Sequence, residues 1–238
     1  MIRFLILFEG RTGSTMLGQM LNQHPQVIHI GEEVSHLQEE GWDAQESWMN
    51  NLFFDTQHFK DPRIKKDAKA IGFKVKLRKI ASEKALQHYI AEHDLKIIYM
   101  TRKNKVKQVI SSIRAIDLYK STGSYNVNGN KAIDLPNSQH IPLDRFNTIL
   151  LWILEAEKRL ECFVSRLNAP VLPITYEALT GDRITTLELV FKFLGVKPVE
   201  SSPITRKITA DDLGKVVKNL DELKWFYRHT AFGPMFEK

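Results

Sequence analysis

Six consecutive residues near the start of the chain combine the groups that bind a phosphate. They are two glycines, one arginine and three hydroxyl residues: Gly10, Arg11, Thr12, Gly13, Ser14 and Thr15. The glycines allow the backbone to turn tightly around an anion, and the free N–H groups at the start of a following helix point toward it. The hydroxyls and the guanidinium of Arg11 add further donors and a fixed positive charge. The stretch therefore predicts a phosphate-binding loop.

This loop differs from the two best-known nucleotide-binding loops. It lacks the Gly-Lys pair of a Walker A loop and is shorter, and its glycines do not follow the order G-x-G-x-x-G. An ordinary capped turn between a strand and a helix is the simpler alternative interpretation.

A second anion-binding motif begins at Arg102, directly after the apolar run at 96–101. Open α/β sheets bind ligands at the carboxyl ends of their strands. Ser111 and Ser112 lie nine and ten residues further on, along a predicted helix. An arginine at a strand end and a serine on the next helix can hold a second phosphate. The two motifs together favour a nucleotide with phosphates at both ends.

The elements that must position these motifs alternate along the chain. Strands are expected at 4–8, 27–30, 71–77, 96–101 and 171–174. Helices are expected from Ser14 to before Pro25, at 82–92, after 101, from about 143 to 167, at 185–194 and at 211–226. Strands that alternate with helices predict an α/β fold with a mostly parallel sheet. Lys74 and Lys76 lie on the polar face of 71–77, where they would meet an anionic ligand or protect an exposed edge strand.

Composition sets broad limits on the class of protein. The chain has 238 residues, of which 43% are hydrophobic and 26% are charged, as in ordinary soluble globular proteins. We expect one domain, 1–238, in which 119–141 is a lid on the acceptor side or a locally disordered loop. The one cysteine, Cys162, excludes an internal disulfide framework, and no residue cluster has the spacing of a metal site. No apolar run is long enough to span a membrane, which predicts a cytoplasmic protein.

These motifs and several other stretches resemble the family of PAPS-dependent sulfotransferases, where PAPS is 3′-phosphoadenosine 5′-phosphosulfate. Residues 8–17 resemble the 5′-phosphosulfate loop of the family, and 99–112 its 3′-phosphate motif. Further stretches are similar to bacterial, carbohydrate-type and trehalose-type members: 21–32, 174–179, 191–196 and 219–223. The resemblance implies a three-layer P-loop-like fold. It also implies transfer of a sulfuryl group from PAPS to a hydroxyl or amine, which leaves PAP (3′-phosphoadenosine 5′-phosphate) and needs no metal.

The resemblance assigns roles to the predicted donor-binding residues. The loop from Gly10 to Thr15 would hold the 5′-phosphosulfate, and Arg11 would stabilise the charge that develops on the departing phosphate. Arg102 and a serine would hold the 3′-phosphate. Many members place this serine eight residues after the arginine, whereas Ser111 lies nine residues after Arg102; we favour Ser111 over Ser112. Lys207, after a turn at Pro203, would close over the same phosphate.

A base must take the proton of the acceptor. Glu32 matches the position of the catalytic carboxylate in the carbohydrate-type and trehalose-type enzymes. The adjacent Glu33 and the nearby His29 and His36 remain alternatives. We expect a small-molecule, carbohydrate or lipid-like acceptor. The sequence leaves its identity and the oligomeric state open.

Two other functions are compatible with parts of this pattern. A small-molecule kinase that uses ATP and Mg²⁺ would share the first loop and the basic second site. However, Thr101 stands where an acidic magnesium ligand would be expected. A nucleic-acid binder would suit the net charge of +6, but no basic stretch interleaved with aromatic residues and no helix-turn-helix pattern occurs. We therefore expect no nucleic-acid partner.

Overall fold

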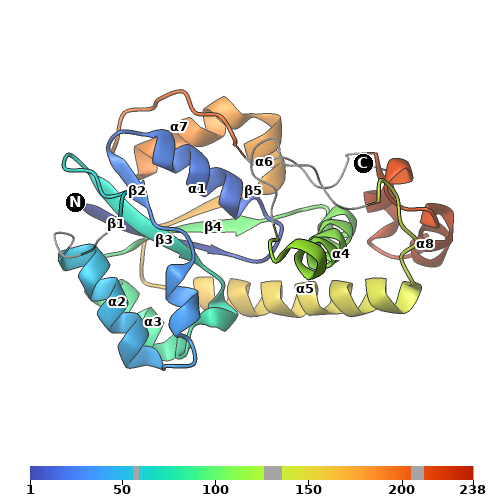
Figure 1. The fold of residues 1–238 in the computed structure, drawn as a ribbon, viewed down its shortest axis with the longest axis horizontal. Helices are drawn as coiled ribbons and strands as arrows, with labels where there is room; N and C mark the ends of the chain where they lie inside the picture. The colour runs from blue at the N-terminus through green and yellow to red at the C-terminus, as the bar shows by residue number, and fades with distance from the viewer. Residues whose placement is uncertain (56–58, 60, 126–135, 205–211, 238) are drawn as a thin grey trace. The chain divides into compact units, whose positions relative to one another are not determined.

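The computed structural model describes residues 1–55, 59, 61–125, 136–204 and 212–237 (Figure 1). The chain forms two compact units. The first contains Met1–Thr101 and Ala156–Pro203, and the second contains Arg102–Glu155 and Ile204–Lys238. The single domain expected from the sequence stays a prediction, because two compact units can belong to one domain.

A five-stranded parallel sheet forms the centre of the first unit. Its strand order is β2-β3-β1-β4-β5, and every pairing is parallel. The strands are β1 (Ile2–Phe8), β2 (Val27–His29), β3 (Ala70–Val75), β4 (Lys96–Thr101) and β5 (Val171–Thr175). This arrangement confirms the predicted α/β fold and its flanked sheet (Figure 1). The edge strand β5 carries an exposed proline, Pro173, in its middle.

Strand β3 is an internal strand, which corrects one reading of the sequence. It pairs with β2 on one side and β1 on the other. All six of its residues are buried, including Lys74. The alternation of lysines therefore does not mark an exposed edge. Gly72 allows the close approach of β1, since a Cβ atom there would lie 2.2 Å from the carbonyl oxygen of Phe4.

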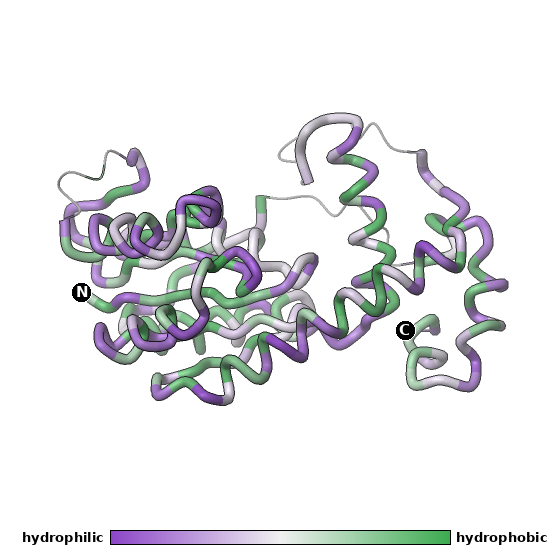
Figure 2. Tube along the Cα trace, turned by 90° about the horizontal axis from the view of Figure 1, so that it is seen from below, coloured by the Kyte–Doolittle hydropathy of each residue, from purple (hydrophilic) through white to green (hydrophobic). Residues whose placement is uncertain are grey.

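Helices cover both faces of the sheet in the first unit. Alternate residues of β1 point to opposite faces, as the two-residue period of a strand requires. Leu5 and Leu7 pack with α2 (Trp42–Phe54), α3 (Glu83–Glu92) and the end of α5 (Leu143–Val164). Phe4, Ile6 and Phe8 pack with α1 (Ser14–Gln23) and α7 (Arg183–Phe193). The result is three layers, and Figure 2 shows hydrophobic residues concentrated along the inner strands.

Short elements complete the first unit. They are the 3₁₀ helices η1 (Glu33–Leu37) and η2 (Leu77–Lys79) and the helix α6 (Tyr176–Gly181). The helix α1 ends before Pro25 as expected, and its length matches the prediction. The helix α2 was not predicted from the sequence.

The second unit has its own hydrophobic core. The helix α4 (Lys105–Thr122) and the first part of α5 pack with η3 (Leu213–Lys215), α8 (Leu220–Tyr227) and η4 (Gly233–Phe236). The single helix expected over 211–226 is confirmed from Leu220 onward by α8 and is wrong for the described residues before it, 212–219. Val217 instead forms an isolated bridge with Gln139, and α8 begins only at Leu220.

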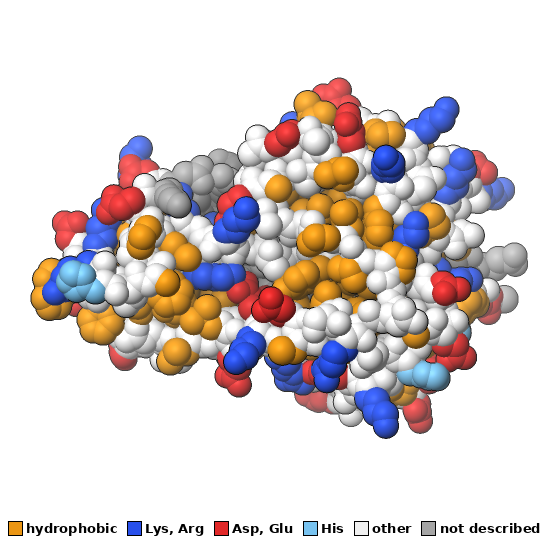
Figure 3. All heavy atoms as spheres, turned by 180° about the vertical axis from the view of Figure 1, so that it is seen from behind, with side chains coloured by type: hydrophobic (Ala, Val, Ile, Leu, Met, Phe, Trp, Pro, Cys, Tyr) orange, Lys and Arg blue, Asp and Glu red, His pale blue; other side chains and the backbone are white. Residues whose placement is uncertain are grey.

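The surface carries hydrophobic as well as charged side chains. Figure 3 shows hydrophobic side chains at the surface among charged ones, and the exposed hydrophobic residues include Leu151, Ile184 and Leu189. Among the described residues, every helix is too short or too polar to cross a membrane. The expected lid at 119–141 begins inside α4, and 126–135 lie outside the described residues.

Candidate active site

The predicted phosphate loop connects the carboxyl end of β1 to the first turn of α1. Its backbone takes left-handed conformations at Arg11, with a φ of 64°, and at Gly13, with a φ of 85°. Gly13 is required for a second reason, because a Cβ atom there would lie 3.0 Å from the ring of Tyr176. No side chain caps the N-terminus of α1, and its first turn contains no acidic residue. The first N–H groups of α1 are therefore suited to an anion.

The three hydroxyls of the loop have different tasks. The Thr12 hydroxyl donates to the carbonyl oxygen of Glu9 at 2.8 Å, and Thr12 is fully buried, so this side chain stabilises the loop itself. Ser14 is buried in the first turn of α1. The Thr15 hydroxyl accepts a hydrogen bond from the ammonium of Lys74 at 2.8 Å. Thr15 thus links the loop to β3.

The ammonium of Lys74 also contacts the predicted base. Its Nζ lies 2.8 Å from Oε1 of Glu32, while Nζ of Lys76 lies 3.0 Å from Oε2 of the same carboxylate. The Lys74 side chain is only 7% exposed, whereas that of Glu32 is 31% exposed and within reach of a ligand. Burial opposes ionisation of Glu32, but the two lysines outweigh it and hold the pKa of Glu32 below its ordinary value. Glu32 is therefore ionised. Lys74 contacts both Glu32 and the loop residue Thr15, and so links the two.

A second ion pair, in which only the carboxylate is buried, supports the loop from its other end. Glu9, the residue between β1 and Gly10, is buried, and its Oε2 accepts a hydrogen bond from Nη1 of Arg78 at 3.0 Å. Burial raises the pKa of Glu9, although Arg78 and Lys76 oppose this shift. The pair ties the start of the loop to η2.

The alternative bases occupy different surroundings. Glu33 forms an ion pair with Arg63 at 2.7 Å. His29 is buried against α1, because a Cβ atom on Gly18 would lie 2.4 Å from its ring. Burial first, and then Lys74 and Arg63, lower the pKa of His29 to about 3. His36 is exposed on η1. Of these four residues, Glu32 is the one with a described ion pair to Lys74, which also bonds to Thr15 of the loop.

The second predicted anion motif lies in the second unit. Arg102 is buried directly after β4, and Ser111 and Ser112 are both buried on α4. The Ser112 hydroxyl donates to the carbonyl oxygen of Gln108 at 2.9 Å, within its own helix. Lys207 lies outside the described residues.

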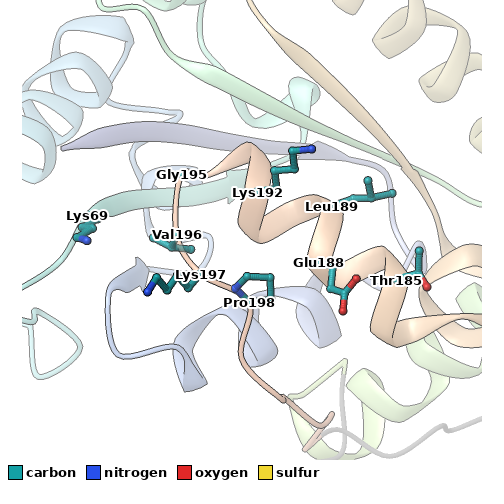
Figure 4. Close-up of a pocket in the computed structure, with 9 residues that line it drawn as sticks. All are labelled: Lys69, Thr185, Glu188, Leu189, Lys192, Gly195, Val196, Lys197 and Pro198. Atoms are coloured by element: carbon teal, nitrogen blue, oxygen red, sulfur yellow. The ribbon is translucent and has the colours of Figure 1, made fainter.

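One hollow in the first unit lies away from this chemistry. It has a volume of about 740 Å³ and is lined by Lys69, Lys192, Lys197 and Glu188 among others (Figure 4). Lys69 precedes β3, and the other two lysines belong to the end of α7 and the segment after it. These positions are at the amino ends of strands, whereas the phosphate loop follows the carboxyl end of β1. The hollow is therefore separate from the candidate active site.

Sequence reasoning missed some residues that shape this site. Glu9, Arg78 and Arg63 were not predicted as site residues. The polar alternation in 71–77 did point to Lys74 and Lys76.

The fold is α/β, with a candidate anion site at the carboxyl edge of a parallel sheet, and comparisons with known proteins identify its family. A family model described as "Sulfotransferase domain" matches residues 3–219. The chain therefore belongs to the sulfotransferase domain family, and the enzyme class is that of transferases of sulfur-containing groups. None of the curated proteins compared with the chain matches it.

Solved structures show the same fold at low sequence identity. A sulfotransferase from Alicyclobacillus acidocaldarius is 16% identical, with a TM-score of 0.52, and the match covers 99% of this chain and 93% of that one. Mouse sulfotransferase SULT7A1, solved in complex with PAP, is 12% identical, with a TM-score of 0.51 and coverage of 99% and 88%. A sulfotransferase domain from the curacin biosynthetic pathway is 15% identical, with a TM-score of 0.50 and coverage of 84% and 76%.

Proposed function

We propose that this domain transfers the sulfuryl group of PAPS to a hydroxyl or amine of a small-molecule acceptor, with Glu32 as the base. One observation carries the proposal. The ammonium of Lys74 lies 2.8 Å from both the Thr15 hydroxyl of the phosphate loop and the Glu32 carboxylate. The anion-binding group and the proton acceptor are thus adjacent, as a direct transfer between donor and acceptor requires.

The reaction places separate demands on the residues of the site. The bond from sulfur to the 5′-phosphate oxygen breaks while a bond from sulfur to the acceptor oxygen or nitrogen forms. The acceptor's proton goes to the Glu32 carboxylate, and the negative charge of the leaving group stays on PAP. Arg11 and the first N–H groups of α1 stabilise that charge. Arginine holds its own proton tightly, so Arg11 acts through its charge and not as an acid.

Lys74 has a further task in this proposal. In the structure it neutralises Glu32, but its contact with Thr15 also places it beside the loop. A sulfuryl group bound beside Thr15 offers oxygens that compete with Glu32 for the same ammonium. Lys74 would then steady the group in transfer and leave Glu32 paired with Lys76 alone.

Donor binding can be tested before any acceptor is known. We expect PAP to bind in the presence of EDTA in isothermal titration calorimetry. Arg11→Ala and Arg102→Ala should each weaken binding about 10- to 100-fold, since a charged hydrogen bond contributes roughly 1.5–3 kcal/mol. Lys84→Ala, which removes an exposed lysine of α3, is the matched control and should bind normally. Failure to bind PAP, with binding of ATP and Mg²⁺ instead, would reject the proposal and favour a kinase.

The acceptor is proposed only as a class. The resemblance to carbohydrate-type and trehalose-type members favours a sugar hydroxyl, and a lipid-like alcohol is the second class to test. A panel of both, assayed by the formation of PAP from PAPS, would separate them.

A further inference from the structure

Arg63 makes contacts that a solvated surface arginine would not make. It lies in the connection between α2 and β3. Its Nη1 donates to the carbonyl oxygen of Ile30 at 2.7 Å, and its Nη2 donates to Oε1 of Glu33 at 2.7 Å. Asp61 accepts from Nε at 2.8 Å and from Nη2 at 2.5 Å, so it fixes the guanidinium in one orientation.

The groups that Arg63 holds belong to the turn that carries Glu32. This turn follows β2 and runs through Ile30, Gly31, Glu32 and Glu33. On its other side, the N–H of Ile30 donates to the carbonyl oxygen of Gly72 at 3.0 Å. The N–H of Lys74 donates to the carbonyl oxygen of Gly31 at 2.8 Å. The turn is therefore held between the backbone of β3 and the guanidinium of Arg63.

The conformation of the turn leaves no room for adjustment at Gly31. Its φ is 89°, which favours glycine. A Cβ atom there would lie 2.8 Å from Oε2 of Glu33, which shows that the Glu33 side chain is folded back over the turn toward Arg63. Two neighbouring carboxylates thus receive different partners: Glu33 has Arg63, and Glu32 has Lys74 and Lys76.

We propose that Arg63 is a positioning residue, which fixes this turn so that Glu32 stays between Lys74 and Lys76 and Glu33 stays away from the phosphate loop. The inference rests on the proposed role of Glu32 as the base. The partners of the Arg63 guanidinium in these four hydrogen bonds are Asp61, Ile30 and Glu33, and none of them belongs to the phosphate loop. Its effect on the reaction is therefore carried by the turn.

Lysine can replace only part of this function. The guanidinium presents five N–H donors in a fixed plane, which allows one group to contact Ile30, Glu33 and Asp61 together. An ammonium at the same place keeps the charge and reaches fewer of these partners. Arg63→Lys should therefore loosen the turn in part, whereas Arg63→Ala should release it.

The experiment is a carboxyl ¹³C NMR titration of glutamate-labelled protein, in which the resonance lost in Glu32→Gln identifies Glu32. In Arg63→Ala we expect the Glu32 midpoint to rise toward its ordinary value, because the carboxylate leaves the two lysines that hold it low. Arg63→Lys should give a smaller rise. Lys66→Ala, which removes an exposed lysine of the same segment, should leave the midpoint unchanged. PAP binding should stay within about twofold of wild type in all three variants.

Two further variants separate the possible failures. Arg63→Lys gives the test if Arg63→Ala does not fold, and Glu33→Gln, which keeps a hydrogen-bond acceptor for Arg63, is the control that should leave the Glu32 midpoint close to that of the wild type. An unchanged Glu32 midpoint in Arg63→Ala, or in Arg63→Lys if the alanine variant is unfolded, would overturn the positioning role alone. Full turnover of PAPS by Glu32→Gln would instead overturn the proposed base and leave the geometric result intact.

Discussion

The Glu32 carboxylate lies between two lysines of one strand, and this determines its response to pH. Its pKa lies below the ordinary value because Lys74 and Lys76 outweigh the effect of burial. A base of this kind is already deprotonated at neutral pH. We expect the acid limb of the kcat/KM profile attributable to Glu32 to lie below the ordinary glutamate value, with activity lost as pH falls through it. A limb above that value would show that Lys74 and Lys76 do not hold the pKa of Glu32 down.

Replacement of the base tests its role directly. Glu32→Gln should reduce kcat roughly 10²- to 10⁴-fold, the usual contribution of a general base, because glutamine cannot take the acceptor's proton. PAP affinity should change little, since glutamine preserves the shape of the side chain. The measurement is the rate of PAP formation with the first acceptor that supports turnover, and Glu39→Gln, an exposed position, is the control. A loss confined to KM would indicate a binding role instead.

Glu9 provides a prediction about stability and not about turnover. Burial raises its pKa in the folded protein, so this group favours the folded state when it is protonated. That contribution is complete below the ordinary glutamate pKa of 4.5 and is lost as pH rises through the raised pKa of the folded protein. Relative to wild type, Glu9→Gln should therefore become more stable between pH 5 and pH 7.5, as measured by urea unfolding at both values. Glu39→Gln should show no such trend.

Residue types and spacing predicted part of this site. The loop from Gly10 to Thr15 lies between a strand and a helix as expected. The contact between Lys74 and Glu32 was not predicted, because it joins residues 42 positions apart through the pairing of β2 with β3. Local pattern contains no information on such pairings. The same holds for Glu9 with Arg78, and for Arg63 with the turn after β2.

At the scale of elements, α1 presents its N-terminus to the anion site and is held at its other end by Lys65. The ammonium of Lys65 donates to the carbonyl oxygens of Asn22, His24 and Val27 at 2.9, 2.7 and 2.7 Å. These carbonyls lie at the end of α1 and the start of β2, where a positive charge is favourable.

Removing this cation should destabilise the protein. Lys65→Met retains the aliphatic part of the side chain but leaves three carbonyl oxygens without their donor. We expect a loss of about 1–2 kcal/mol in the free energy of unfolding, reduced from the full value of a charged hydrogen-bond group because Lys65 is partly exposed. Urea unfolding measures it, and Lys66→Met is the matched control. Equal stabilities of the two variants would show that the carbonyls are satisfied by solvent.

Elements with a clear apolar period were predicted well, and those with polar core residues were not. The strands and α1, α3 and α5 follow from sequence pattern within a few residues. The helix α2 was missed because it has the polar residue Gln45 at a fully buried position. The Gln45 amide donates to the carbonyls of Val34 and Lys79 and accepts from the N–H of Ala81, which only the folded chain reveals. Toward the C-terminus, Val217 is buried beside its bridge partner Gln139 and not on a helix, so helical spacing misled.

At the scale of the whole molecule, each compact unit contains one of the two predicted phosphate motifs. We expect PAP to raise the unfolding midpoint, by about 2.7 kcal/mol of stability at 100 times its Kd. Adenosine 5′-monophosphate lacks the 3′-phosphate and should stabilise less. Arg102→Ala should remove the difference between the two nucleotides, as measured by thermal unfolding with each. A difference that persists in this variant would place the 3′-phosphate elsewhere.

Pro173 also has a consequence for how the molecule behaves at high concentration. An edge strand exposes a row of backbone N–H and C=O groups that can pair with a strand of another molecule. Proline lacks the N–H, so β5 offers an interrupted row in its middle. Pro173→Val would complete that row with a residue that favours strands. We expect this variant to self-associate in sedimentation velocity at concentrations where the wild type keeps its original size distribution. We thus expect this single proline to limit intermolecular β-pairing at this edge of the described sheet.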